Sequence, residues 1–70
     1  MKFNIELDRE QDGRWIADIP ELPGVMMYGA SQPEALRKVQ ILALHVIADL
    51  IESGQFEPLE NVAFISSQAA

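Results

Sequence analysis

The chain has 70 residues, enough for one small domain whose core needs support from disulfides, a metal ion or partner chains. It contains no cysteine, which excludes disulfides and thiolate metal sites and favours a reducing compartment such as the cytoplasm. Eleven acidic residues against five basic ones give a net charge of −6, which disfavours binding to nucleic acid or to an anionic membrane surface and favours a basic partner.

The first part of the sequence has the pattern of a β-hairpin. Every second residue from Phe3 to Leu7 is apolar, so these side chains share one face of an extended strand. The Asp-Gly pair that ends at Gly13 tolerates the positive φ angles of a tight turn. Alternation resumes from Trp15 to Ile19, which predicts a second strand antiparallel to the first.

A rigid turn is predicted after this hairpin. Pro20 and Pro23 remove two backbone donors and Gly24 allows a positive φ, so a regular ladder cannot continue through the segment. The turn either only joins two strands or also serves as a preorganised recognition loop. Residues 25–28 predict a third short strand, in which Met26, Met27 and Tyr28 fit the core, an oligomer interface or a partner contact.

A capping box marks the start of one long helix. The Ser31 hydroxyl can accept from the Glu34 amide, while the Glu34 carboxylate can reach back to the Ser31 amide. No glycine or proline interrupts residues 34–53, and Gly54 provides a C-terminal stop. Apolar residues recur at spacings of three and four, as on a helix that packs against a core. The sequence therefore predicts a helix over residues 34–53.

More apolar residues lie on this helix than one small sheet can cover. We interpret the surplus as a second contact surface that holds together a homo-oligomer, either a dimer or a tetramer. The apolar stretch 41–51 is well short of the ~20 residues that a membrane-spanning helix requires. The residues expected at the oligomer interface are Ile41, Leu44, Ala48 and Ile51.

A fourth strand is predicted over residues 62–65, which completes the element order β-β-β-α-β. The expected fold class is α+β, a small antiparallel sheet with one long helix packed on it. We assign residues 1–66 to this domain and residues 67–70 to a polar C-terminal tail.

Four blocks of the sequence match a known family in both order and spacing. They are residues 12–17 (DGRWIA), 19–24 (IPELPG), 28–31 (YGAS) and 34–36 (EAL). With these blocks the chain resembles the HicB-like antitoxins from residue 3 to residue 58, and residues 20–24 are the most specific part of the resemblance. The resemblance implies a partial ribonuclease-H-like fold without nuclease activity.

The resemblance also implies a function and a partner. Members of this family belong to type II toxin-antitoxin systems and neutralise a small basic toxin that cleaves messenger RNA, by covering the surface that would meet RNA. Many members carry an additional C-terminal DNA-binding module, which this chain does not show, so we expect no operator binding by this chain alone. The competing interpretation is a small-molecule-binding regulator or an enzyme on the same fold, its partner lost.

The positions of the acidic residues distinguish between an enzyme and a binding module. Ribonuclease-H enzymes hold magnesium between carboxylates, and Glu6 and Asp8 share one face of the first strand. That face is opposite the apolar one, so we interpret it as solvated and expect no catalysis, metal or cofactor. His45 has no nucleophile nearby in the sequence and is interpreted as structural or interfacial.

The expected partner-binding residues are Glu6, Asp8, Asp18, Glu21 and Leu22. The residues expected to shape the fold are Gly13, Pro20, Pro23, Gly24, Ser31 and Glu34.

Overall fold

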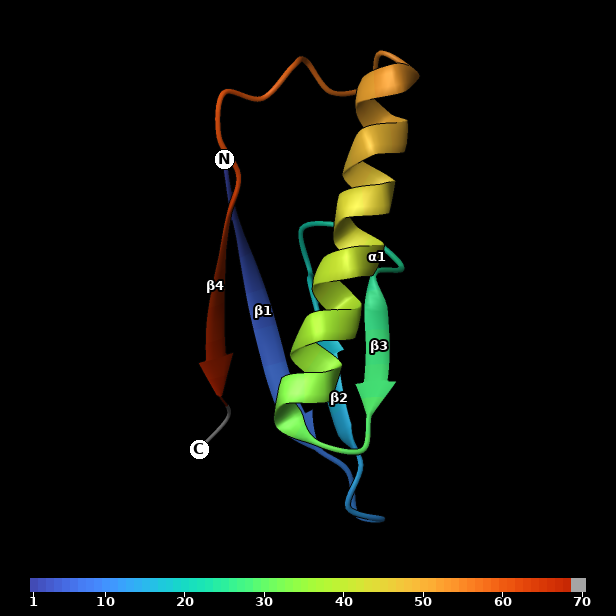
Figure 1. The fold of residues 1–70 in the computed structure, drawn as a ribbon, viewed down its shortest axis with the longest axis vertical. Helices are drawn as coiled ribbons and strands as arrows, with labels where there is room; N and C mark the ends of the chain where they lie inside the picture. The colour runs from blue at the N-terminus through green and yellow to red at the C-terminus, as the bar shows by residue number, and fades with distance from the viewer. Residues whose placement is uncertain (69–70) are drawn as a thin grey trace.

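Four strands and one helix form two layers in the computed structural model, which describes residues 1–68 (Figure 1). The sheet has the strand order β3-β2-β1-β4, and α1 lies across one of its faces (Figure 1). The predicted α+β class and the order β-β-β-α-β are confirmed. The elements are β1 (Lys2–Arg9), β2 (Trp15–Asp18), β3 (Met26–Gly29), α1 (Gln32–Glu52) and β4 (Ala63–Gln68).

The core lies between the sheet and the helix, as the alternation of residues in β1 predicts. Phe3, Ile5 and Leu7 are buried, while the residues between them are exposed. Leu7 lies opposite Ala17 in the register of β1 and β2, so Ala17 joins the same buried face. The helix contributes four buried residues at intervals of four, which places them on one side of the helix. They are Ala35, Val39, Ala43 and Ile47.

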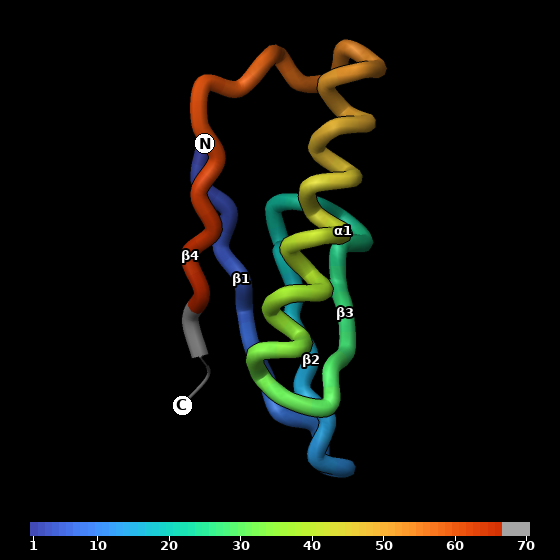
Figure 2. The backbone as a smooth tube through the Cα atoms, in the orientation of Figure 1, coloured from blue at the N-terminus to red at the C-terminus, as the bar shows by residue number. Residues whose placement is uncertain are grey.

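The sheet is mixed and not wholly antiparallel, because β4 runs parallel to β1, from Lys2 opposite Ala63 to Leu7 opposite Gln68. The chain leaves β3 and passes along α1 to the other end of the sheet, then residues 53–62 carry it across to β4 (Figure 2). A strand-helix-strand crossover of this kind produces parallel strands. Pairing with β1 also extends β4 to Gln68, into the expected tail, whose residues 69 and 70 lie outside the described part.

The turns have the backbone angles that their glycines permit. Gly13 has φ 92° and Gly24 has φ 83°, both in the left-handed region. Between β2 and β3, the Ile19 N–H donates to the Val25 carbonyl over 3.0 Å, and the Val25 N–H donates to the Leu22 carbonyl over 3.0 Å. These hydrogen bonds close the loop containing the two prolines into a defined turn.

The helix begins at Gln32, and Ser31 is its N-cap. The Ser31 Oγ accepts from the Glu34 N–H over 3.3 Å, which is the first half of the expected capping box. The second half does not form, because the Glu34 carboxylate instead lies 2.9 Å from the Lys38 Nζ. This hydrogen bond from Lys38 is the main reason that the pKa of Glu34 lies below its usual value.

Gly29 brings the end of β3 into close contact with the first turn of the helix. A Cβ atom at this position would lie 2.5 Å from the Ala35 backbone nitrogen and 2.9 Å from the Ala35 Cα. Both distances are shorter than any ordinary contact, so the approach depends on the missing side chain. Within residues 1–68, no helix has both the length and the apolar character needed to cross a membrane.

Candidate functional site

The sheet face turned away from α1 carries the acidic residues that the sequence singled out. Glu6 lies directly opposite Asp18 in the register of β1 and β2, and Asp8 lies opposite Ile16. On β3, Met26 is the neighbour of Asp18 and Tyr28 is the neighbour of Ile16. We call this surface the outer face. Its members named here are Glu6, Asp8, Ile16, Asp18, Met26 and Tyr28.

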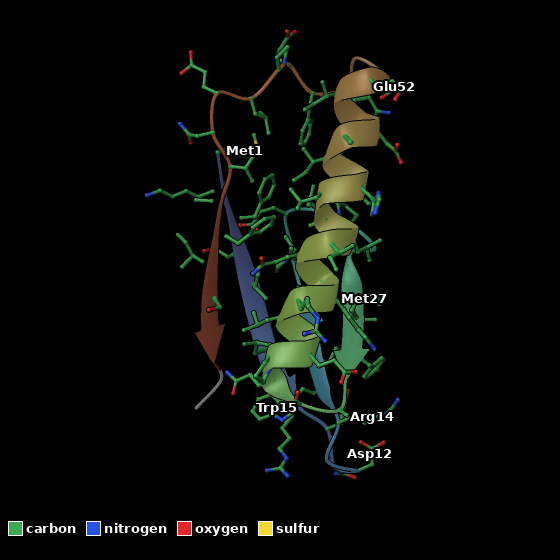
Figure 3. All side chains as sticks on the ribbon, viewed as in Figure 1. Met1, Asp12, Arg14, Trp15, Met27 and Glu52 are labelled. Atoms are coloured by element: carbon green, nitrogen blue, oxygen red, sulfur yellow. The ribbon has the colours of Figure 1, made fainter. Side chains whose placement is uncertain are left out.

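The register resolves the orientation of β3, which the sequence left open. Met26 and Tyr28 point to the outer face and are 47% and 39% exposed, whereas Met27 lies on the inner face beside the buried core (Figure 3). Four consecutive apolar residues give no alternation from which to read this orientation. Apolar side chains therefore flank the acids of the outer face on one side.

The three acids of the outer face have no cationic partner within the described residues. The ion pairs among the described residues join Arg14 to Asp12, at 2.7 Å, and Lys38 to Glu34, at 2.9 Å. Glu6 and Asp18 are like charges in directly opposite positions, an arrangement that destabilises a sheet. The binding of a cationic group beside them would relieve this repulsion.

Arg14 is a basic residue that contacts the apolar part of the outer face. Its guanidinium lies 4.4 Å from the centre of the Tyr28 ring, in a cation–π contact. Its Nε also donates to the Asp12 Oδ2, and its backbone N–H donates to the Asp12 Oδ1 over 3.0 Å. This backbone hydrogen bond is the main cause of the lowered pKa of Asp12. Asp12, Arg14 and Trp15 lie together at the hairpin end of the molecule (Figure 3).

Glu21 fastens the turn between β2 and β3 to β1. Its carboxylate accepts from the Asn4 backbone N–H at 3.2 and 3.3 Å and from the Asn4 Nδ2 at 2.7 Å. Its own backbone N–H and these two donors keep its pKa below the usual value. Because Asn4 lies beyond the last paired residue of β2, the Glu21 carboxylate occupies the place of a missing strand partner. Glu21 therefore has a structural partner already.

Leu22 was expected to contact a partner, and this prediction is wrong. Its side chain is only 2% exposed and belongs to the hydrophobic core. The turn folds back between Ile19 and Val25, and the backbone hydrogen bonds across it direct Leu22 inward. A leucine between two prolines has no periodic neighbours that would indicate its orientation. The candidate partner surface is therefore reduced to Glu6, Asp8 and Asp18, with the apolar residues beside them.

The apolar surface of the helix is smaller than the sequence suggested. Ile41 and Leu44 are each 51% exposed, and Ala48 is exposed beside them. Ile51 was expected in the same surface but is half-buried and packs against the core. We call Ile41, Leu44 and Ala48 the helix surface.

The described part of the chain holds no cluster of metal-binding groups. Within residues 1–68, no three His, Cys, Asp or Glu side chains converge in a way that could hold an ion. His45 is exposed on the helix, four residues before the exposed Asp49. The outer face presents carboxylates and apolar side chains side by side.

Comparison with known proteins adds one relative. A UPF0150 protein of Thermoplasma acidophilum is 26% identical over 69 residues, which cover 99% of this chain and 100% of the relative. The chain is similar to a UPF0150 protein. No protein-family model matches the chain, and no solved structure matches it. The UPF0150 match spans the sequence of all five elements.

Proposed function

We propose that this chain is a HicB-like antitoxin that binds a small basic RNA-cleaving protein and covers the surface with which that protein grips RNA. The observation that carries the proposal is the outer face, where Glu6 and Asp18 lie opposite each other, with Asp8 two residues along β1. The four sequence blocks within residues 12–36 and the full-length similarity to a UPF0150 protein support it. In this proposal the chain acts by binding alone, without catalysis or a cofactor.

The chemistry of RNA explains why carboxylates suit this role. A protein that grips RNA presents Lys and Arg side chains to the phosphates, and much of its affinity comes from these contacts. Glu6, Asp8 and Asp18 offer negative charges to the same side chains from two hydrogen-bonded strands. The strands fix the backbone of these residues, so binding has to order only their side chains.

The apolar neighbours of the acids supply the second component of an interface. Protein interfaces combine aromatic and methionine side chains with a polar rim, and a few such residues contribute most of the affinity. Ile16, Met26 and Tyr28 occupy this position on the outer face, beside the acids. The acids would steer the basic partner and fix its orientation, while these three side chains would hold it.

The test begins with a gene for a short basic protein adjacent to the gene for this chain. Expression of that protein alone should arrest growth, and co-expression of this chain should restore it. Binding of the two purified proteins should weaken as salt is raised, since charge contacts contribute to it. Growth arrest without rescue, or the absence of a complex at low salt, would refute the proposed function.

Two variants with equal charge locate the contact. The first replaces Glu6, Asp8 and Asp18 by Gln, Asn and Asn, which changes the net charge from −6 to −3 (−6 + 3). The second makes the same change in net charge at the opposite end of the molecule. It carries Gln at Glu52, Glu57 and Glu60, all of them exposed.

Both variants lose the same long-range attraction, so the first should lose more affinity and more salt dependence than the second, because it alone removes the local contacts. Replacing the three acids by uncharged amides is preferable to reversing their charge, since three changes to Lys would bring the net charge of the chain to zero and promote precipitation. An equal loss in both variants would show that the acids of the outer face form no local contact.

A further inference from the structure

The strand β3 forms one edge of the sheet and has hydrogen-bonding groups that are not used within the chain (Figure 1). Along an antiparallel pair, residues alternately face the partner strand and face away from it. Val25 accepts from Ile19 on the β2 side, so Met27 and Gly29 also face β2. Met26 and Tyr28 therefore direct their N–H and C=O groups outward from the edge. None of the described hydrogen bonds of turns and loops uses these groups.

Although β3 is short, with four residues, this edge lacks the other common features that prevent a strand from pairing with another chain. Sheet edges are commonly protected by Lys, Pro, a bulge or a covering loop. β3 has the sequence MMYG, with no charge and no proline, and both of its outer-face side chains are well exposed. The net charge of −6 comes from other parts of the chain, so β3 is a place where a second acidic molecule can approach.

We propose that two copies of this chain pair antiparallel through β3, about a twofold axis at Met27. In this register Met26 of each copy lies opposite Tyr28 of the other, and each such pair exchanges two hydrogen bonds. Four hydrogen bonds then join the two sheets into one sheet of eight strands. The arrangement is closed and self-complementary, because Met26 and Tyr28 are equally distant from the axis. It goes beyond the proposed function, since it requires no toxin.

The side chains on the outer face favour a second copy over an unrelated strand. Met26 of one copy and Tyr28 of the other would be cross-strand neighbours, which gives a sulfur-aromatic contact on each side of the axis. On the other side of Met26, its neighbour on β2 is Asp18. Tyr28 and Asp18 of the second copy would be two strand spacings apart, about 10 Å between backbones.

Arg14 provides charge complementarity across this junction. Its guanidinium already lies over the Tyr28 ring, so pairing brings it toward Asp18 of the second copy. The symmetry creates two such Arg14–Asp18 contacts, which offset the repulsion between two acidic chains. In the single chain Arg14 pairs with Asp12, and both of these side chains are more than half exposed, so the guanidinium can serve either carboxylate.

The helix surface is the competing site for self-association. It offers two large apolar side chains, Ile41 and Leu44, with no free backbone groups beside them. A matched pair of variants separates the two sites. Met26→Lys and Leu44→Lys make the same change in charge at side chains of similar exposure, 47% and 51%.

Sedimentation velocity from micromolar to submillimolar concentration measures the association. Wild type should show a concentration-dependent monomer–dimer equilibrium, which Met26→Lys abolishes and Leu44→Lys leaves intact. Met26→Pro removes only the outward N–H and spares every hydrogen bond to β2. It deletes two of the four intermolecular hydrogen bonds, so it should raise the dimer dissociation constant about tenfold or more. Circular dichroism confirms that each variant is folded.

A charge exchange tests the pairing itself. Arg14→Asp should weaken the dimer, and adding Asp18→Arg to it should restore the dimer, a recovery that a merely structural role would not produce. A wild type that stays monomeric at all concentrations would overturn the proposal. So would a dimer that Leu44→Lys dissociates and both Met26 variants leave unchanged. Because no toxin is present, these outcomes are independent of the antitoxin experiment.

Discussion

Replacing Gly29 by alanine tests how closely β3 and the helix approach each other. The added Cβ would lie 2.5 Å from the Ala35 nitrogen, whereas ordinary contact begins at 3.4 Å, so the gap must widen by 0.9 Å (3.4 − 2.5). The opposing atoms are helix backbone held by the Ser31 cap, and they cannot rotate away as a side chain would. Overpacking that forces backbone to move costs about 1–3 kcal/mol, and we expect a loss near the upper end, about 3 kcal/mol.

Gly24→Ala is the matched control, because it adds the same methyl group where no atom lies within 4 Å. Its cost comes only from the φ of 83°, about 1–2 kcal/mol for a side-chain-bearing residue. Urea unfolding at one protein concentration, followed by circular dichroism, measures both. With a slope of about 1 kcal/mol per molar urea, the midpoint should fall by about 3 M for Gly29→Ala and by about 1–2 M for Gly24→Ala. A Gly29→Ala midpoint at or above that of Gly24→Ala would refute the tight contact.

Three further changes test the cap, the link from the turn to β1, and the exposed carboxylates. Ser31→Ala should cost about 1 kcal/mol and lower the melting temperature by about 4–8 °C; an unchanged melting temperature would show that the cap contributes nothing. Glu21→Ala should accelerate hydrogen exchange at the Asn4 amide, measured by NMR, and a rate equal to that of wild type would argue against the link. Asp12, Glu21 and Glu34 have lowered pKa values, so their stabilising effect is complete above their usual values of 3.8 and 4.5 and is lost as pH falls through the folded-state values. The urea midpoint should therefore decrease on acidification below pH 4.5, and a midpoint that rose would contradict these shifts.

Local chemistry was enough to predict the elements of this fold. Alternation from Phe3 to Leu7 defines both the strand and its buried face, since side chains alternate across any strand. The Ser31 hydroxyl and the uninterrupted residues after it define the start of the helix within two residues. These signals act between residues that are close in the sequence, and for that reason they can be read without a structure.

Contacts between distant segments were not predictable in the same way. The parallel direction of β4 follows from the path of the helix across the sheet, which no residue of β4 encodes. The hydrogen bonds from Asn4 to Glu21 join residues 17 positions apart, and the burial of Leu22 depends on how its turn folds back. For the candidate site, the alternation predicted the exposure of Glu6 and Asp8, and only the register placed Asp18 directly opposite Glu6.

The parallel pairing of β1 with β4 also has a consequence for the order of folding. It joins Lys2 to Ala63, which are 61 positions apart (63 − 2), whereas β1 and β2 meet through a short hairpin. Contacts of such wide separation form late, because a long loop must close before they add stability. During synthesis, β1 is therefore complete long before β4 emerges, and in that interval one of its edges is open to other nascent chains. We expect refolding yields to fall with rising protein concentration more steeply when β4 is deleted, since β1 then stays an open edge.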